Sequence, residues 1–313
     1  MGLDIGAVMS KGIIIDRHDN IIASACCYTK GDPISATRQL IKELRNEIDV
    51  DNYQVVAVGV TGSARKLVGT LLGAVSINNE ITAQTMGTIK LYPDVKTIME
   101  IGGESAKIIL VNNGIVNDFA VNTSCTAGVG IFMDNFAKTL DIDVADIGRI
   151  AIGSHNKVGV TSRCAVFAGT DLIYKIQTGY KREDVLAGLC QMVAKNYINT
   201  VTKDKKKQSP IVFNGGVSKN IAVIRELEAL IGEKIIVNKN SHLMGAYGVA
   251  ILARDSKKET CFDFNIDNYK LETKMTDCNN CANNCKLVLV YKNDKLIDHW
   301  GNRCKEIDIF KNV

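Results

Sequence analysis

The sequence has no long hydrophobic run, and this absence excludes a membrane protein. No segment reaches the roughly 18 consecutive apolar residues of a membrane-spanning helix. The first residues, MGLDIGAVMSKGIIID, also lack the basic start and the cleavage pattern of a signal peptide. We therefore expect a cytoplasmic protein with no membrane partner.

The sequence also lacks a strong charge of one sign. Its net charge is only +4 over 313 residues. The densest basic run, KDKKKQ at 203–208, has no aromatic or arginine-rich surroundings and is typical of a solvated loop. We therefore expect no nucleic-acid partner. The 4 histidines share no spacing, which favours surface or capping roles over a metal site.

Cysteine, in contrast, is abundant, with 10 in the chain. In a reducing compartment, clustered cysteines indicate metal or redox chemistry more than disulfides. The hydrophobic content of 46% and the length of 313 residues allow one large domain or two modest ones, each with its own core.

A repeated pattern of strands, glycine loops and helices organises the chain. The first copy contains a helical pattern at 35–48, and later helices are expected at 183–201, 219–231 and 241–254. Strands are expected at 12–16, 20–28 and 54–60, then at 97–101, 106–111, 115–121 and 210–213. The repetition predicts duplicated α/β halves that face each other across a cleft.

The predicted boundaries follow from this repetition. We expect residues 1–82 and 239–256 to form the first subdomain, and residues 83–238 to form the second. Residues 257–313 differ in character, because they are polar and rich in cysteine, and we expect a small appended module. A hairpin is expected at 286–300, with Asn293 and Asp294 at its turn.

Three glycine-bearing stretches stand next to strand patterns. The first glycine loop is DIGAVMSK at 4–11, the second is EIGGESAK at 100–107 and the third is FNGGVSKN at 213–220. Glycine lets backbone N–H groups turn towards an anion. One such loop is weak evidence, but two hairpin loops that grip one polyphosphate from opposite walls require the duplicated arrangement. The predicted nucleotide contacts are Gly6, Ala7, Ser10, Lys11, Gly102, Gly103, Ser105, Lys107, Gly215, Gly216 and Lys219.

The third glycine loop has two interpretations. Its glycines would let a flat ring approach the backbone. Alternatively it is only a helix-capping turn, with Asn214 or Ser218 as the cap.

The order and spacing of these loops resemble the actin, hexokinase and Hsp70 type of ATPase, with ribonuclease H-like halves. More closely, residues 1 to about 254 resemble the BadF/BadG/BcrA/BcrD type, the activator ATPases of 2-hydroxyacyl-CoA dehydratases and benzoyl-CoA reductases. Besides the three loops, the segments that carry this resemblance are VTGSAR at 60–65, NEITAQTMG at 79–87, NTSCTAGVGIFMD at 122–134, SRCAVFAGTDLI at 162–173 and LMGAYGVA at 243–250.

Cys125 and Cys164 stand in matching contexts, NTSC and TSRC. Each is expected at a helix N-terminus, with Ser or Thr before it as a cap, where the helix dipole favours a thiolate. Two buried structural cysteines are the plain alternative. A [4Fe–4S] cluster takes four thiolates, so two per chain would require a two-fold dimer. The resemblance implies that arrangement, with one cluster bridging a homodimer.

The sequence departs from this family in its phosphate loops. Ala7 stands where Ser or Thr is usual, and Glu104-Ser105 stands where Gln-Asp commonly follows the glycines. The carboxylates left for Mg²⁺ and the attacking water are Asp4, Glu100 and Glu104. Only five residues precede Gly6, which is short for a central strand, and we expect a weaker fold if the start is truncated.

The tail carries a second cysteine group, Cys278, Cys281, Cys285 and Cys304, with Cys261 as a spare. Four thiolates at the base of a hairpin suit Zn²⁺ or an iron–sulfur cluster. Scattered cysteines without a metal are the alternative. A module with so little core favours a metal as its staple.

The resemblance implies an ATP-driven electron injector. Reduced ferredoxin or flavodoxin would load the cluster, and ATP-linked movement would pass an electron to a partner iron–sulfur dehydratase or reductase. One alternative is a small-molecule kinase of the same fold, of the amino-sugar type, with an Asp as base. Another is a nucleotide-gated scaffold or metal sensor, which only the tail supports.

Overall fold

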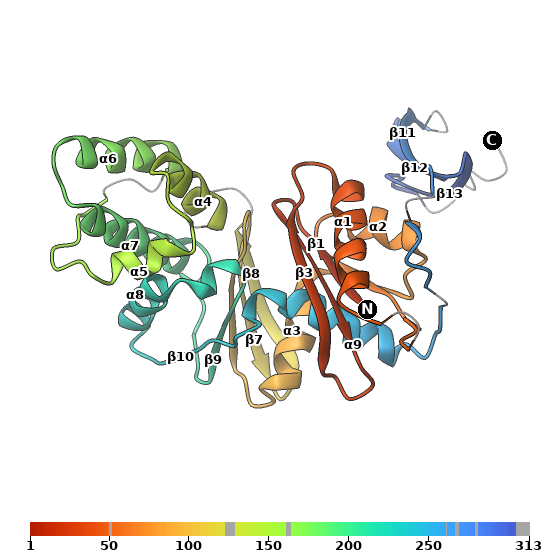
Figure 1. Cartoon of the computed structure of the whole chain (residues 1–313), viewed down its shortest axis with the longest axis horizontal. Coiled ribbons are helices and arrows are strands. Elements are labelled where there is room, and N and C mark those ends of the chain that lie inside the picture. Colours follow the sequence, from red (N-terminus) through yellow and green to blue (C-terminus); the bar gives the residue numbers. More distant parts are fainter. Residues whose placement is uncertain are drawn as a thin grey trace. The chain divides into compact units, whose positions relative to one another are not determined.

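The computed structural model describes residues 1–49, 52–122, 129–160, 164–260, 262–266, 269–278 and 281–304. The chain divides into two compact units (Figure 1). Unit 1 comprises Met1–Asn79 and Val249–Val313, and unit 2 comprises Glu80–Gly248. The boundaries therefore lie at 79/80 and 248/249, compared with the predicted 82/83 and 238/239. No helix within the described residues is long and apolar enough to cross a membrane.

Unit 1 is built on a five-stranded sheet in the order β3-β2-β1-β4-β5. The first three strands are antiparallel, and β4 and β5 join in parallel. The strands are β1 (Gly2–Ile5), β2 (Met9–Ile15), β3 (Ile21–Tyr28), β4 (Gly59–Thr61) and β5 (Ser76–Ile77), and the helices are α1 (Pro33–Asn46) and α2 (Arg65–Leu72). Asp32 caps α1 by accepting hydrogen bonds from the N–H groups of Ile34 and Ser35.

The short strand β1 occupies the centre of this sheet. Its four residues are all buried, and it pairs with β2 on one side and β4 on the other. The strand predicted at 54–60 is much shorter in the structure, where only Gly59–Thr61 is regular. Residues 55–58 pair through isolated bonds instead, such as that from the N-terminal amine of Met1 to the carbonyl of Ala57 at 2.8 Å.

Unit 2 repeats this plan, as the sequence predicts. Its sheet has the order β10-β9-β6-β7-β8, again an antiparallel three-stranded meander followed by two parallel strands. The strands are β6 (Thr97–Ile101), β7 (Ala106–Asn112), β8 (Ile115–Asn122), β9 (Ile211–Asn214) and β10 (Ile235–Ile236). The duplicated α/β architecture of the actin and hexokinase type is therefore confirmed.

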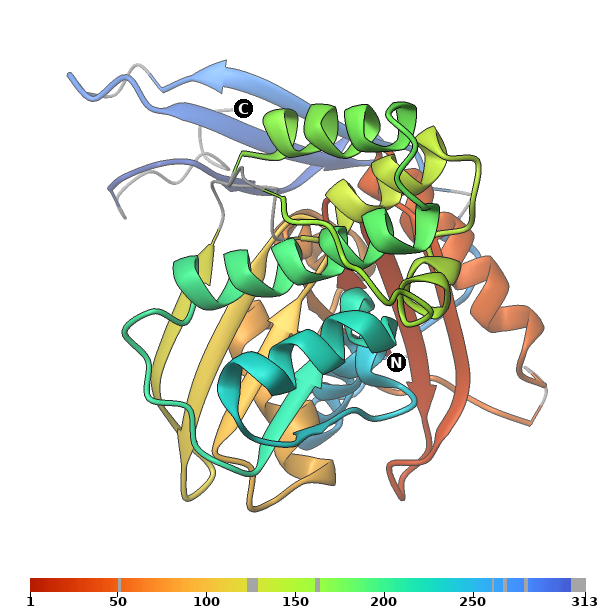
Figure 2. The same ribbon diagram turned by 90° about the vertical axis from the view of Figure 1, so that its left-hand side faces the viewer.

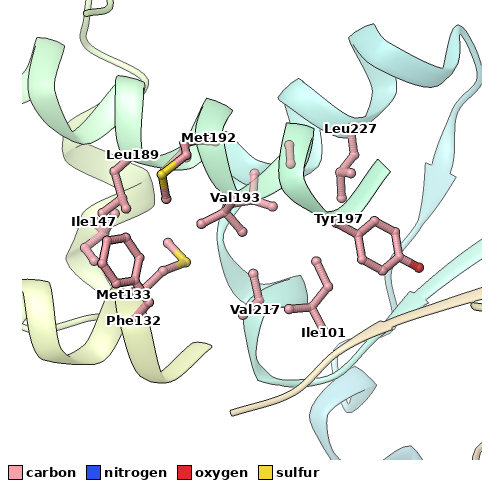
Figure 3. Close-up of a cluster of buried hydrophobic side chains, with 14 of the residues drawn as sticks. Ile101, Phe132, Met133, Ile147, Leu189, Met192, Val193, Tyr197, Val217 and Leu227 are labelled. Atoms are coloured by element: carbon pink, nitrogen blue, oxygen red, sulfur yellow. The ribbon is translucent and has the colours of Figure 1, made fainter. Parts of the chain in front are cut away.

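Helices of unit 2 supply its large core. They are α3 (Glu80–Leu91), α4 (Gly130–Thr139), α5 (Asp146–Ala151), α6 (Ala165–Gln177), α7 (Arg182–Thr200), α8 (Ile221–Ile231), the short 3-10 helices η2 (Gly216–Lys219) and η3 (Ser241–Leu243), and α9 (Met244–Asp255), which contains the boundary with unit 1. Figure 2 shows α7 and α8 lying in front of the strands. In Figure 3, Phe132 and Met133 of α4 pack near Leu189 and Met192 of α7, so α4 is anchored by burial.

The tail forms a third sheet, in the order β11-β12-β13. Its antiparallel strands are β11 (Leu271–Asp277), β12 (Lys286–Lys292) and β13 (Lys295–Trp300). Asn293 and Asp294 both have positive φ, 51° and 61°, as a two-residue hairpin turn requires. The hairpin predicted at 286–300 is therefore present. The strand β11 is additional, and the polar sequence of residues 271–277 did not predict it.

Candidate functional site

The first glycine loop turns between β1 and β2 and is supported from within unit 1. Gly6 donates its N–H to the carbonyl of Met9 at 3.2 Å, and a Cβ on Gly6 would lie 2.8 Å from that oxygen. The Thr29 hydroxyl donates to the Gly6 carbonyl at 2.7 Å. Fully buried Ser10 lies 2.8 Å from the same Thr29 hydroxyl. Ser10 therefore holds the loop through Thr29, while its predicted nucleotide contact stays a prediction.

Asp4 and Lys11 lie opposite each other where β1 and β2 pair. Their charged atoms are 3.7 Å apart, and both side chains are largely buried. The first glycine loop, which includes Ala7, therefore runs from Asp4 to Lys11, and these two residues form an ion pair. The structure brings together these two predicted residues in unit 1.

The second glycine loop turns between β6 and β7 in unit 2. The N–H of Gly102 donates to the carbonyl of Ser105 at 2.9 Å and closes the turn. Glu104 is exposed at the tip, whereas Glu100 at the end of β6 is buried. The two predicted carboxylates of this loop therefore lie in very different surroundings, and only Glu100 is desolvated.

Lys107 is the centre of a charged cluster in unit 2. Its ammonium lies 2.9 Å from Glu100, 2.7 Å from Glu80 and 2.7 Å from the Ser105 hydroxyl. Burial alone would lower the pKa of Lys107, but the charges of Glu100 and Glu80 outweigh it and raise that pKa above its usual value. The cluster carries two carboxylates for one ammonium, so it keeps one net negative charge.

Glu80 is a site residue that the sequence reasoning missed. It is the first residue of α3, and Gln84 and Thr88 follow it at intervals of four along one face of that helix. The side-chain amide of Asn214 donates to Gln84 at 3.2 Å and to Thr88 at 2.8 Å. One face of α3 therefore contacts residues of both β7 and β9. The four-residue spacing of polar residues in NEITAQTMGT was the available signal.

The third glycine loop follows β9 beside Glu100. Asn214 is the register partner of Glu100, and Gly215 has a φ of +89°, which favours glycine. A Cβ on Gly215 would lie 2.3 Å from the Ile101 carbonyl oxygen and 3.0 Å from a carboxylate oxygen of Glu100. This close approach explains the glycine and places Gly215 and Gly216 next to the charged cluster.

The cap of the following helix corrects one expectation. Asn220 caps α8, accepting from the N–H groups of Ala222 and Val223 at 3.0 and 3.1 Å, so neither Asn214 nor Ser218 does. Ser218 instead donates to the Gly215 carbonyl at 2.6 Å and shapes the loop. Lys219 lies beside His242, with their nitrogens 3.2 Å apart on the exposed side.

The start of α4 is attached directly to the second glycine loop. The N–H groups of Gly130 and Ile131 donate to the carbonyls of Gly102 and Gly103, both at 2.8 Å. A Cβ on Gly130 would lie 3.0 Å from the Gly102 oxygen. Two of the amides that open α4 are therefore satisfied by the loop, and glycine at position 130 allows the close approach.

The structure describes one of the two predicted cluster cysteines. Cys125 lies outside the described residues, and α4 begins at Gly130, five residues later, with Val129 as its N-cap. Cys164 is exposed and is itself the N-cap residue of α6. Neither helix has the expected Ser or Thr cap, because Val129 and Cys164 occupy the N-cap positions, whereas Cys164 does lie at a helix start as predicted.

The surface beside Cys164 is apolar. Val166, Phe167 and Tyr174 of α6 are 73%, 69% and 62% exposed. A hollow of about 560 Å³ lies between α4 and α6, with Phe132 and Ile173 in its lining. An exposed apolar face of this kind is characteristic of a protein interface.

The tail cysteines lie at one end of the third sheet. Cys278 and Cys285 are buried, Cys281 is exposed and Cys304 is half-buried. Among the described residues, no three His, Cys, Asp or Glu side chains are arranged to hold a metal ion. The tail metal site stays a prediction, and Cys261 lies outside the described residues.

Comparisons with known proteins point to one family. Residues 1–253 match the model of the BadF/BadG/BcrA/BcrD ATPase family. The chain is 33% identical to the 2-hydroxyisocaproyl-CoA dehydratase activator of Clostridioides difficile, over 83% of this chain and 96% of that protein. It is 29% identical to the (R)-2-hydroxyglutaryl-CoA dehydratase activating ATPase of Acidaminococcus fermentans, over 81% of this chain and 96% of that protein.

A solved structure extends the likeness to three dimensions. The activator of the 2-hydroxyisocaproyl-CoA dehydratase from Clostridium difficile, with bound ADPNP, superposes with a TM-score of 0.75 at 32% identity. The match covers 82% of this chain and 94% of that one. The family match, the duplicated sheets and the glycine loops lead to one conclusion: this chain is an ATPase that belongs to the BadF/BadG/BcrA/BcrD family.

Proposed function

We propose that this protein is an ATP-dependent activator that passes a low-potential electron to a partner iron–sulfur enzyme of the 2-hydroxyacyl-CoA dehydratase type. Two relatives, each matched over 96% of its own length, are named as activators of such dehydratases. A third relative, at 23% identity, belongs to the benzoyl-CoA reductase of Thauera aromatica. The class of partner is therefore a dehydratase or reductase.

The observation that carries this proposal is the attachment of α4 to the second glycine loop. A phosphate held by the N–H groups of that loop sets the positions of the Gly102 and Gly103 carbonyls. Those carbonyls accept from the first two amides of α4. A shift of the loop would therefore displace the start of α4, whose Phe132 and Met133 pack in the core of unit 2. Cys125 precedes that start by five residues.

The charged cluster provides the chemistry of hydrolysis. Lys107 bridges buried Glu100 and partly exposed Glu80, and the net negative charge of this cluster suits Mg²⁺ or a positioned water. Asp4 is the corresponding carboxylate in unit 1, paired with Lys11. Because Glu104 is exposed at the loop tip, we assign the positioning of the water to Glu100 and no catalytic role to Glu104.

Cys164 is suited to bind one iron of a [4Fe–4S] cluster. It is exposed at the N-cap of α6, where the helix amides favour negative charge. Cys125 would supply the second thiolate, so a homodimer is needed to complete four. The apolar face of Val166 and Phe167 next to Cys164 supports a second copy at this place. The bound cluster would supply one-electron transfer, loaded by reduced ferredoxin or flavodoxin.

Iron content of anaerobically purified protein tests the proposal. We expect about four iron atoms per dimer from the shared cluster. Cys164→Ser and Cys125→Ser should lose this iron yet still bind ATP, whereas Cys26→Ser, which removes an exposed thiol on β3, should keep it. A colourless wild-type protein that phosphorylates amino sugars would instead establish the kinase alternative.

A further inference from the structure

The third sheet brings two cysteines directly opposite each other. The pairing of β11 with β12 ends at Asp277 and Lys286, and the N–H of Cys278 then donates to the carbonyl of Cys285 at 2.8 Å. Opposite residues of an antiparallel pair have Cβ atoms roughly 4.5–5.5 Å apart. Cys278 and Cys285 therefore stand as neighbours at the base of the β11–β12 connection.

A third cysteine lies within that connection. The N–H of Asn284 donates to the carbonyl of Cys281 at 3.2 Å, and Asn284 has a φ of +41°. The chain therefore makes a turn between Cys281 and Cys285, which keeps Cys281 at the same end of the sheet.

The fourth cysteine reaches this end from β13. Because β13 is antiparallel to β12 and ends at Trp300 opposite Val288, its chain leaves the sheet beside the start of β12. Gly301 has a φ of +106°, and a Cβ there would overlap the Lys286 carbonyl. This close passage directs the chain towards Cys304, whose carbonyl accepts from the Asn302 amide at 2.7 Å.

The core of this sheet is too small to explain its order by burial alone. Its buried cluster consists of Cys278, Cys285, Leu287 and Leu289, so half of it is cysteine. Modules with so few apolar side chains usually depend on a disulfide or a metal ion. Tyr291 and Leu296 pack against this cluster, and Cys278 and Cys285 are not joined in a disulfide. A metal ion bound by the cysteines would add a cross-link to this small core.

We propose that Cys278, Cys281, Cys285 and Cys304 bind one Zn²⁺ ion in a tetrahedral thiolate site that stabilises the tail. The spacings C-x2-C and x3-C, on a tight connection between paired strands, suit ligands of a single ion. Among the described residues these side chains do not form a metal-binding group, so the proposal requires the four cysteines to converge when the ion binds. The proposal is independent of the proposed function, whose cluster uses other cysteines.

Zinc and iron measured separately by mass spectrometry on the full-length protein test this site. We expect about one zinc per chain in the wild type. Cys281→Ser and Cys304→Ser should each lose it, and neither replaces a fully buried residue, so the two five-stranded sheets should keep their fold while the tail loses stability. Cys26→Ser is the matched control and should keep its zinc. Cobalt in place of zinc should show thiolate charge-transfer absorption in the wild type and in Cys26→Ser. The absorption should be absent from Cys281→Ser and Cys304→Ser.

Three results would overturn the proposal. The first is wild-type protein without zinc, and the second is zinc that survives both Cys281→Ser and Cys304→Ser. The third is iron that persists in the Cys125→Ser/Cys164→Ser double variant and disappears with Cys304→Ser, which would make the tail an iron–sulfur site. Because the bridging iron depends on Cys125 and Cys164, failure of this proposal is distinguishable from failure of the proposed function.

Discussion

Replacing Gly130 by alanine tests the link between the nucleotide loop and α4. The new Cβ would lie 3.0 Å from the Gly102 oxygen and 3.4 Å from the Gly103 Cα, so the loop must give by a few tenths of an ångström. That movement weakens two hydrogen bonds, each contributing about 1 kcal/mol. Alanine favours helix by up to about 1 kcal/mol, so we expect unfolding free energy to fall by only about 1 kcal/mol.

The effect on coupling should be larger than the effect on stability. Losing about 1–2 kcal/mol of coupling corresponds to roughly a 5- to 30-fold loss of ATP-stimulated electron transfer to the partner. The assay is the rate of partner reduction with ATP compared with ADP, together with ATP affinity. Gly159→Ala is the control, because a Cβ at Gly159 meets nothing within 4 Å. Wild-type ATP stimulation in Gly130→Ala would refute the reasoning.

Three further predictions concern the charged cluster, the thiols and a helix cap. Lys107→Met removes the ammonium that pairs with buried Glu100, and should lower the unfolding free energy by about 3–5 kcal/mol in urea denaturation, with partial recovery on adding Glu100→Gln; an unchanged midpoint would contradict the cluster. Burial raises the pKa of Cys27 to about 11 and of Cys190 to about 12, so iodoacetamide at pH 8 should label exposed Cys26 and spare both, as read by peptide mass spectrometry; rapid labelling of Cys190 would contradict its burial. Asp32→Ala should cost about 1 kcal/mol. Because the Asp32 pKa is lowered in the fold, chiefly by the bond from Ser35, this contribution is present above the unfolded pKa and lost as pH falls through the folded one, which a stability profile at acidic pH would show.

Much of the fold could be predicted from local pattern. The turn at Asn293 and Asp294 follows from residues that tolerate positive φ, and the two glycine loops with their flanking strands follow from repetition. The strand at 54–60 was overestimated because apolar alternation persists where Val55 and Val58 are buried without a regular partner strand. Burial and pairing give the same sequence signal there.

The site was predicted less completely, because its contacts are long-range. Glu80 reaches Lys107 and Asn214 reaches Gln84, and no local pattern reports pairs so far apart in the sequence. Lys107 was assigned to the nucleotide, whereas the structure shows it held by two carboxylates; its nucleotide contact stays a prediction. The attachment of α4 depends on backbone carbonyls of Gly102 and Gly103, which carry no side-chain signature.

The most direct test of the account is electron transfer to a purified partner dehydratase under anaerobic conditions. Wild-type protein reduced by ferredoxin should reduce the partner when ATP is present and should not do so with ADP. Cys164→Ser should bind ATP as the wild type does and transfer no electrons. Partner reduction by Cys164→Ser at the wild-type rate, or transfer by the wild type without ATP, would contradict the central claim.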